Sequence, residues 1–251
     1  MRNECYNDIL HEDRSAALRL VHSFLQTLES QALIKVLKQQ YPDAIIVPVR
    51  AIEAHGKNKI PLVMAEYIGS LTGNTVDISI VQTNRVHRTV KDEWHRFAFR
   101  PSFDGEVKSG QNYILVDDVF SNGGSFSELR LFIERNGGHV VHVVAMATGM
   151  SGNEIAPRPE TLQSLIDKYS PDTLSSFLKE VKLYDGNFKA LTEPEARSLR
   201  RAPSLDEARD RILAARRQGN TRMGAKSPQE DEYQAPQIDP LEIHHRRKFR
   251  R

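Results

Sequence analysis

Four short apolar runs alternate with helix-like segments over residues 44–148, and this alternation restricts the fold more than any other feature. The runs are AIIVPV (44–49), VDISIVQ (76–82), YILVDDV (113–119) and HVVHVVAMAT (139–148). Of the segments between them, 59–72 has Pro61 in its first turn and Gly73 after its end, and 125–138 ends in Gly137-Gly138, as helices commonly do. Strands that alternate with helices predict an α/β fold with a parallel central sheet.

The regions before and after the predicted sheet have sequence patterns typical of helices. Apolar positions close to a 3.6-residue repeat over 14–39 predict one or two helices before the sheet. After the sheet, 161–169, 173–184, 191–201 and 204–218 also predict helices. Beyond Gly219 the chain is polar and proline-rich, which favours disorder. We expect an N-terminal helical segment (1–40), a core (41–152), a helical extension (153–218) and a disordered basic tail (219–251). Residues 83–110 are aperiodic and long for a connector, so we expect a functional loop there.

Composition excludes several protein classes. With 251 residues and 39% hydrophobic content the chain can bury a core, and its formal net charge of +2 is no polyelectrolyte signal. Cys5 is the single cysteine, so an internal disulfide and a cysteine-built zinc site are excluded. We find no secretory leader and no run of roughly 18 apolar residues. We therefore expect a cytoplasmic protein that does not bind membranes.

Asp117 and Asp118 stand where an apolar strand ends, and SNGGS (121–125) leads from them into a helix. Ligands of open parallel sheets bind at the carboxyl ends of the strands. A glycine-containing turn before a helix N-terminus suits a phosphate. Carboxylates beside a phosphate suit sugar hydroxyls or a developing positive charge. Together these features predict a site for a phosphorylated sugar.

These residues carry a family resemblance. ILVDDVFSNGGS resembles the phosphoribosyl-pyrophosphate signature of type I phosphoribosyltransferases. VPV, HGKNKIPLVMAEYIG, an arginine-rich stretch containing AF, and VDDV are together similar to the ComF group of that superfamily. The resemblance covers about residues 44–148. It implies the type I phosphoribosyltransferase fold, with N-terminal helices and a helical to disordered C-terminal extension added to it.

The resemblance also implies roles for individual residues. Asp117 and Asp118 would be catalytic, holding the ribose 2- and 3-hydroxyls and contacting Mg²⁺ indirectly through hydroxyls or water. The 5-phosphate would lie on the turn made by Ser121, Asn122, Gly123, Gly124 and Ser125. The short pyrophosphate loop (50–54) would contribute Arg50 and Ala51, with Lys57 nearby. Residues 83–110 correspond to the family's mobile flap, whose pyrophosphate ligands would be Arg85, Arg88, Lys91 and Arg96.

The implied activity is transfer of the phosphoribosyl group from phosphoribosyl pyrophosphate to an unidentified acceptor, usually a nucleobase, in nucleotide metabolism. Pyrophosphate is released and Mg²⁺ is the cofactor. The sequence departs from the family's pattern at four points. Phe120 replaces an aliphatic residue and Asn122 replaces the commoner threonine, and both are compatible with an anion-binding turn. Ser121 replaces the aspartate that serves as a base in the purine-salvage branch, and RAIEAHG (50–56) lacks the glycine-containing loop of many members.

Alternatives stay open. A non-catalytic sensor or regulator could use the same donor site and act on a protein or nucleic-acid partner. A protein associated with nucleic acid, with the fold as a scaffold, is a third alternative. HHRRKFRR at the C-terminus suits either nucleic-acid contact or plain solubilisation. Trp94 could stack on an acceptor base, although aromatic residues more often pack. A homodimer is a further expectation. An ATPase is disfavoured because no GxxxxGK[ST] motif is present.

Overall fold

The central sheet contains three parallel strands. The computed structural model describes residues 14–50, 52–53, 56–84, 93–120, 123–148 and 155–224, with side chains left undescribed at 52–53, 56–57 and 219–224. Within these residues, β1 (Ile45–Pro48), β6 (Asn112–Phe120) and β7 (His139–Thr148) pair in the order β1-β6-β7. All neighbours are parallel, with Val47 opposite Leu115 and Leu115 opposite Val143. The predicted α/β class with a parallel sheet is confirmed.

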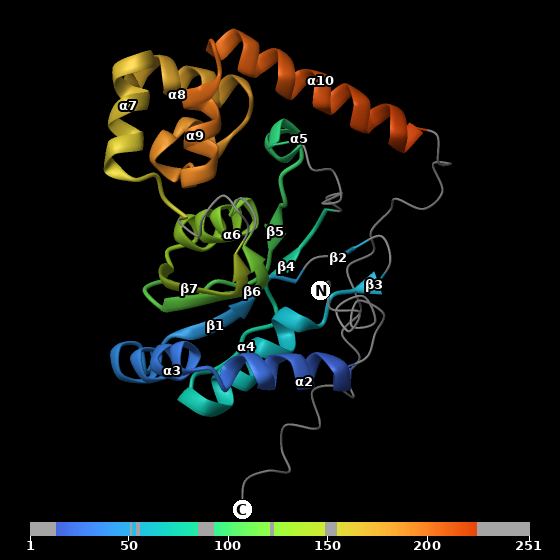
Figure 1. Ribbon diagram of the computed structural model, residues 1–251, viewed down its shortest axis with the longest axis vertical. Helices are drawn as coiled ribbons and strands as arrows, with labels where there is room; N and C mark the ends of the chain where they lie inside the picture. The colour runs from blue at the N-terminus through green and yellow to red at the C-terminus, as the bar shows by residue number, and fades with distance from the viewer. Residues whose placement is uncertain are drawn as a thin grey trace, which may run out of the picture. The chain divides into compact units, whose positions relative to one another are not determined.

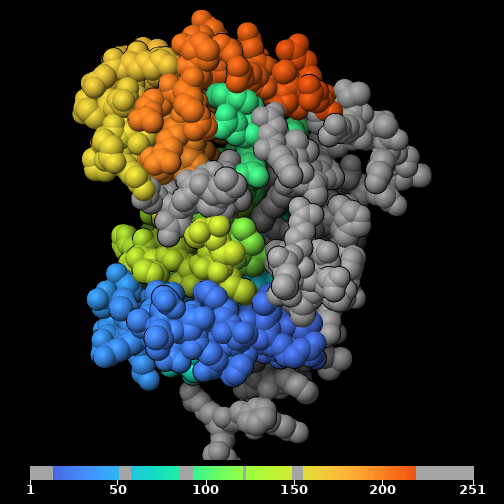
Figure 2. All heavy atoms as spheres, viewed as in Figure 1, coloured from blue at the N-terminus to red at the C-terminus, as the bar shows by residue number. Residues whose placement is uncertain are grey.

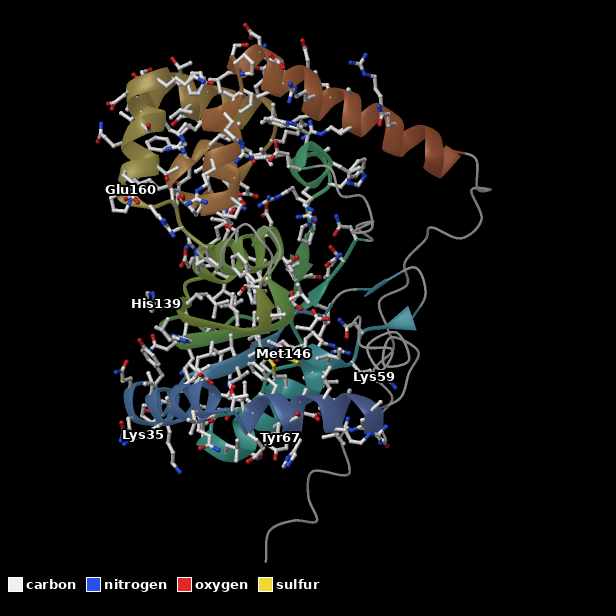
Figure 3. All side chains as sticks on the ribbon, in the orientation of Figure 1. Lys35, Lys59, Tyr67, His139, Met146 and Glu160 are labelled. Atoms are coloured by element: carbon white, nitrogen blue, oxygen red, sulfur yellow. The ribbon has the colours of Figure 1, made fainter. Side chains whose placement is uncertain are left out.

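Helices cover both faces of this sheet (Figure 1). Alternate strand residues face opposite sides, so Ile46, Ile114 and Val116 pack against α2 (Arg14–Leu25), α3 (Leu28–Gln40) and α4 (Ile60–Thr72). Ile45, Val47 and Leu115 face α6 (Gly124–Arg135) instead. Burial on both sides explains why the strands read as continuous apolar runs. Figure 2 shows α2 and α3, in blue, as a continuous layer over one side. Met146 of β7 also packs against the α2–α4 cluster (Figure 3).

Several sequence-predicted helix boundaries are confirmed. The segment predicted over 14–39 forms two helices: α2 ends at Leu25, and Thr27 caps α3, its side chain accepting a hydrogen bond from the Ser30 amide at 3.3 Å. Gly73 closes α4 with φ of 87°, and Gly137 follows α6 with φ of 85°.

The predicted continuous strand over 76–82 is wrong. Val76 forms an isolated parallel bridge with Ile46, and β4 (Val81–Gln82) pairs antiparallel with β5 (Phe103–Asp104). Two local contacts interrupt the ladder between them. The Asp77 carboxylate accepts from the Ser79 amide at 2.8 Å, and the Arg50 guanidinium donates to the Ile78 carbonyl at 2.7 Å. A turn-forming side chain therefore competes with strand pairing here.

A helical module follows the sheet and consists of α7 (Pro159–Tyr169), α8 (Pro171–Glu180), α9 (Glu193–Arg201) and α10 (Leu205–Gly224). The 3₁₀ turns η1 (Tyr184–Gly186) and η2 (Phe188–Ala190) lie between α8 and α9. The predicted helix over 173–184 is too long: α8 ends at Glu180 because Lys182 and Tyr184 have φ of 55° and 49°. The domain boundaries themselves stay a prediction.

The predicted aperiodic loop over 83–110 contains regular structure. It includes β5 and a short helix, α5 (Glu93–Ala98). Trp94 and Phe97 of α5 are 5% and 2% exposed and belong to the hydrophobic core of the helical module. The Glu93 carboxylate accepts from Ser198 at 2.6 Å and from Arg201 at 2.8 Å on α9. The segment that resembles a flap is therefore packed into the helical module at α5.

No helix among the described residues has both the length and the apolar character needed to cross a bilayer.

Candidate functional site

The paired aspartates lie at the carboxyl end of the middle strand. Asp117 and Asp118 are the sixth and seventh residues of β6, and Asp117 pairs with Ala145 of β7. Both are buried, at 3% and 6% exposure. The Asp117 carboxylate accepts from the Asp118 amide at 2.9 Å, and the Asp118 carboxylate accepts from the Val119 amide at 2.8 Å. These contacts fix one oxygen of each carboxylate on the backbone.

Asn58 orients the second carboxylate and was not predicted from the sequence. Its Nδ2 donates to Oδ2 of Asp118 at 2.8 Å, and its Oδ1 accepts from the Ile60 amide at 3.0 Å. The start of α4 and the end of β6 are thus joined by one amide side chain. The Asn58 amide therefore fixes the orientation of the Asp118 carboxylate at the end of β6.

The glycine turn, Gly123 and Gly124, begins α6. Gly123 has φ of 73°, in the left-handed region that favours glycine, and it caps the helix without a side-chain hydrogen bond. The amides of Gly124, Ser125 and Phe126 donate to no acceptor among the described residues, as expected of a first helical turn. The first turn also contains no acidic residue. This helix end can therefore receive an anion.

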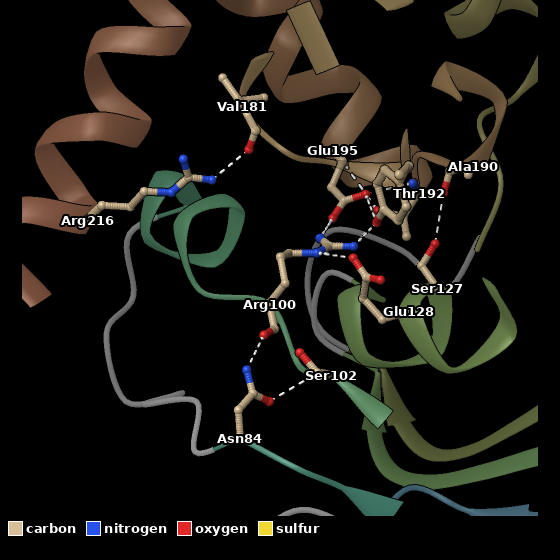
Figure 4. Close-up of polar contacts among 11 residues, drawn as sticks. Asn84, Arg100, Ser102, Ser127, Glu128, Val181, Ala190, Thr192, Glu195 and Arg216 are labelled. Atoms are coloured by element: carbon tan, nitrogen blue, oxygen red, sulfur yellow. Dashed lines mark hydrogen bonds and ion pairs between the residues drawn. The ribbon is translucent and has the colours of Figure 1, made fainter. Parts of the chain in front are cut away.

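Arg100 lies beside the glycine turn and was also missed. Its guanidinium contacts three groups, the carboxylates of Glu128 and Glu195 and the hydroxyl of Tyr184 (Figure 4). Burial alone would lower the pKa of Arg100, but the carboxylates of Glu195 and Glu128 outweigh it and hold that pKa well above its ordinary value. Burial raises the pKa of Tyr184 well above its usual range. Arg100 therefore stays charged and Tyr184 neutral.

The structure describes only some of the remaining residues that were predicted to bind the ligand. Arg50 follows β1, as expected, but its guanidinium donates to the Ile78 carbonyl and so has a structural contact. Lys57 lies on β3 (Gly56–Lys57), which pairs with β2 (Ile52–Glu53). Lys59, two residues after Lys57, stands just before α4 (Figure 3). The other predicted ligands lie outside the described residues: Ala51, Arg85, Arg88, Lys91, Ser121 and Asn122.

Trp94 packs rather than lining a ligand site. Its ring stacks on Phe97 with centroids 5.4 Å apart, and the Arg211 guanidinium lies 5.6 Å from its centroid. Base stacking by Trp94 is therefore not supported. Arg96 is carried on the same short helix.

Comparison with curated proteins finds relatives that are much longer than the matched region. The chain is 40% identical over 213 residues to "Protein TraN" of Escherichia coli, covering 85% of this chain and 46% of that protein. It is 41% identical over 91 residues to an "Uncharacterized protein" of Haemophilus influenzae, covering 36% and 20% respectively. The chain thus spans less than half the length of these curated relatives. No protein-family model matches it.

Similar solved structures are phosphoribosyltransferases at low identity. One adenine phosphoribosyltransferase is 12% identical with a TM-score of 0.35, covering 55% of this chain and 73% of its own. Adenine phosphoribosyltransferase from Thermoanaerobacter pseudethanolicus is 15% identical with a TM-score of 0.34, covering 57% and 85%. Orotate phosphoribosyltransferase from Aeropyrum pernix is 18% identical with a TM-score of 0.30, covering 55% and 75%.

Proposed function

We propose that the chain binds phosphoribosyl pyrophosphate at the carboxyl end of β6 and transfers its phosphoribosyl group to a nucleobase. The observation that carries this proposal is the succession of β6 and α6: two buried aspartates lie near the carboxyl end of the strand, and Gly123, in the left-handed region, starts the helix that follows. A sugar phosphate suits both parts of this arrangement, the aspartates and the helix N-terminus. Its phosphate suits the helix N-terminus, and its hydroxyls suit the carboxylates.

The reaction would be a displacement at the anomeric carbon. A ring nitrogen of the base forms a bond to that carbon while the bond to the pyrophosphate oxygen breaks. The electron pair leaves with pyrophosphate, and the nitrogen's proton passes to solvent. Asp117 and Asp118 would hold the 2- and 3-hydroxyls and stabilise the positive charge that develops on the ribose, an effect that is stronger in a buried setting.

Mg²⁺ would be held at this site mainly by the donor. Among the described residues, no group of three or more histidine, cysteine or acidic side chains could hold a metal. Two buried carboxylates can still contact a hydrated ion through ribose hydroxyls or water, as hard cations allow. When bound, Mg²⁺ would neutralise charge on the pyrophosphate.

Calorimetric titration and a pyrophosphate-release assay over a nucleobase panel test the proposal. The wild-type chain should bind the donor with Mg²⁺ and release pyrophosphate with some base, and Asp118→Asn should abolish release. Asp210→Asn on α10 is the matched control, because Asp210 is exposed and distant in sequence from the motif. A wild-type chain that does not bind the donor, or Asp118→Asn with unchanged release, would refute the proposal.

A sensor that binds the donor without turnover is the second candidate. The observation that favours it is the packing of α5 into the core of the helical module, because a flap anchored in this way is less free to close. Donor binding without release over the whole panel would support it. The ComF-like branch, the cytoplasmic location, the homodimer and a contact through the C-terminal tail stay predictions.

A further inference from the structure

Arg100 joins three separate elements around the glycine turn. It follows α5, its Nε donates to Oε1 of Glu128 on α6 at 2.9 Å, and its two other nitrogens donate to Glu195 on α9 and Tyr184 of η1. Figure 4 shows the guanidinium between the α6 and α9 carboxylates. One planar side chain therefore ties the flap-like segment and the helical module to the helix that begins at the glycine turn.

This cluster is buried and its members depend on one another. The side chains of Arg100 and Glu195 are 12% and 4% exposed, and Glu128 is 19% exposed. Oε2 of Glu195 also accepts from the Thr192 amide at 2.9 Å and from the Tyr184 hydroxyl at 2.7 Å. Glu195 is thus held in place by its own helix cap and by η1. Removing the guanidinium would leave two carboxylates without their cation in a poorly solvated place.

Arg100 and Glu195 also pack directly against the glycine turn. A Cβ added at Gly124 would lie 3.2 Å from Nη1 of Arg100 and 3.8 Å from Oε1 of Glu195. A Cβ added at Gly123 would lie 2.9 Å from the Thr192 methyl group. On the next residues of α6, Ser127 Oγ donates to the Ala190 carbonyl at 2.8 Å. The helical module therefore contacts this helix end directly.

We propose that Arg100 is a positioning residue for the sugar 5-phosphate, an inference that rests on the proposed function. It holds the first turns of α6 through Glu128, and it cancels the negative charge that Glu128 and Glu195 bring close to the phosphate position. Without it, the same turn would present two uncompensated carboxylates to an incoming anion. The helical module would thus be part of the donor site through Glu195.

Two ligands separate this role from general stability. Ribose 5-phosphate should bind at the glycine turn, whereas pyrophosphate with Mg²⁺ should bind at the loop after β1. Arg100→Met should weaken ribose 5-phosphate binding by about ten-fold or more, as expected for loss of charge-assisted contacts. Pyrophosphate binding should change by less than about two-fold, because the contacts of the Arg100 guanidinium among the described residues are with Glu128, Glu195 and Tyr184 and not with that loop. Calorimetry on the full chain measures both.

A rescue variant and a stability control complete the experiment. Adding Glu195→Gln to Arg100→Met removes one uncompensated carboxylate and should recover part of the lost ribose 5-phosphate affinity. Leu174→Ala is the control: Leu174 is fully buried in the module core, so this variant should lower stability and leave both affinities unchanged. If Arg100→Met does not fold, Arg100→Lys takes its place, and it should weaken ribose 5-phosphate binding selectively because it loses the planar fork.

The outcomes are distinct. Equal losses for both ligands, or no loss for either in a folded Arg100 variant, would overturn the positioning role and leave the proposed function standing. A wild-type chain that binds neither the donor nor ribose 5-phosphate would overturn both. Selective loss with rescue supports the role.

Discussion

Replacing Gly123 by alanine should destabilise the protein by an amount that can be divided into two parts. The first is conformational: at φ of 73° a residue with a Cβ costs about 1–2 kcal/mol. The second is steric, because the added Cβ would lie 2.5 Å from Cζ of Phe120 and 2.9 Å from Cγ2 of Thr192. Overpacking of this kind costs about 1–3 kcal/mol. The free energy of unfolding should fall by about 2–5 kcal/mol in all.

Gly73→Ala isolates the first part. Gly73 has φ of 87°, and an added Cβ there meets nothing within 4 Å, so only the conformational cost of about 1–2 kcal/mol should appear. Urea unfolding followed by circular dichroism measures both variants on the same chain. If Gly123→Ala loses no more stability than Gly73→Ala, the contacts of Phe120 and Thr192 with the glycine turn are not as tight as described, and the reasoning fails.

Two further predictions concern the packing of α5 and the sheet. Trp94→Ala should lower the free energy of unfolding by about 3–5 kcal/mol, because it leaves a cavity in the module core; urea unfolding measures this, and an unchanged midpoint would contradict the assigned packing. Burial lowers the pKa of His142 below its ordinary value of 6.5, so the folded protein favours the neutral ring. Its contribution to stability should be present above pH 6.5 and be lost as the pH falls below it. His142→Asn should flatten this acid loss in thermal unfolding scans, whereas the same change at exposed His139 on β7 should not.

The parallel sheet and its flanking helices could be predicted because their signals are local. A strand buried on both faces gives a continuous apolar run, as in β1, and Gly73 and Gly137 mark helix ends by their backbone freedom. The broken edge strand was not predictable in this way. Its alternation over 76–82 suits a strand, but Asp77 and Arg50 redirect the backbone through contacts that composition does not reveal.

The site was predictable only where its residues are adjacent in the chain. Asp117, Asp118 and the glycine turn share one motif, so their proximity follows from the strand and the helix that carry them. Asn58 and Arg100 reach the site from other segments, and no local pattern marks them. Glu195 could be predicted to lie in a helix start, because Thr192 and Glu195 form a capping box. That motif gives no indication that Glu195 also binds an arginine 95 residues earlier in the chain.

The insertion of α5 into the helical module constrains how this chain could be recombined with a homologue. Trp94 and Phe97 share one core with Leu165, Leu174 and Leu199, so the two sides of that core are encoded on either side of β6 and β7. A crossover between α5 and α7 would pack Trp94 and Phe97 from one parent against leucine side chains from the other parent. Chimeras that exchange residues 93–98 together with 155–216 should fold. Chimeras that exchange either block alone should be less stable, because the two sides of the core then come from different parents.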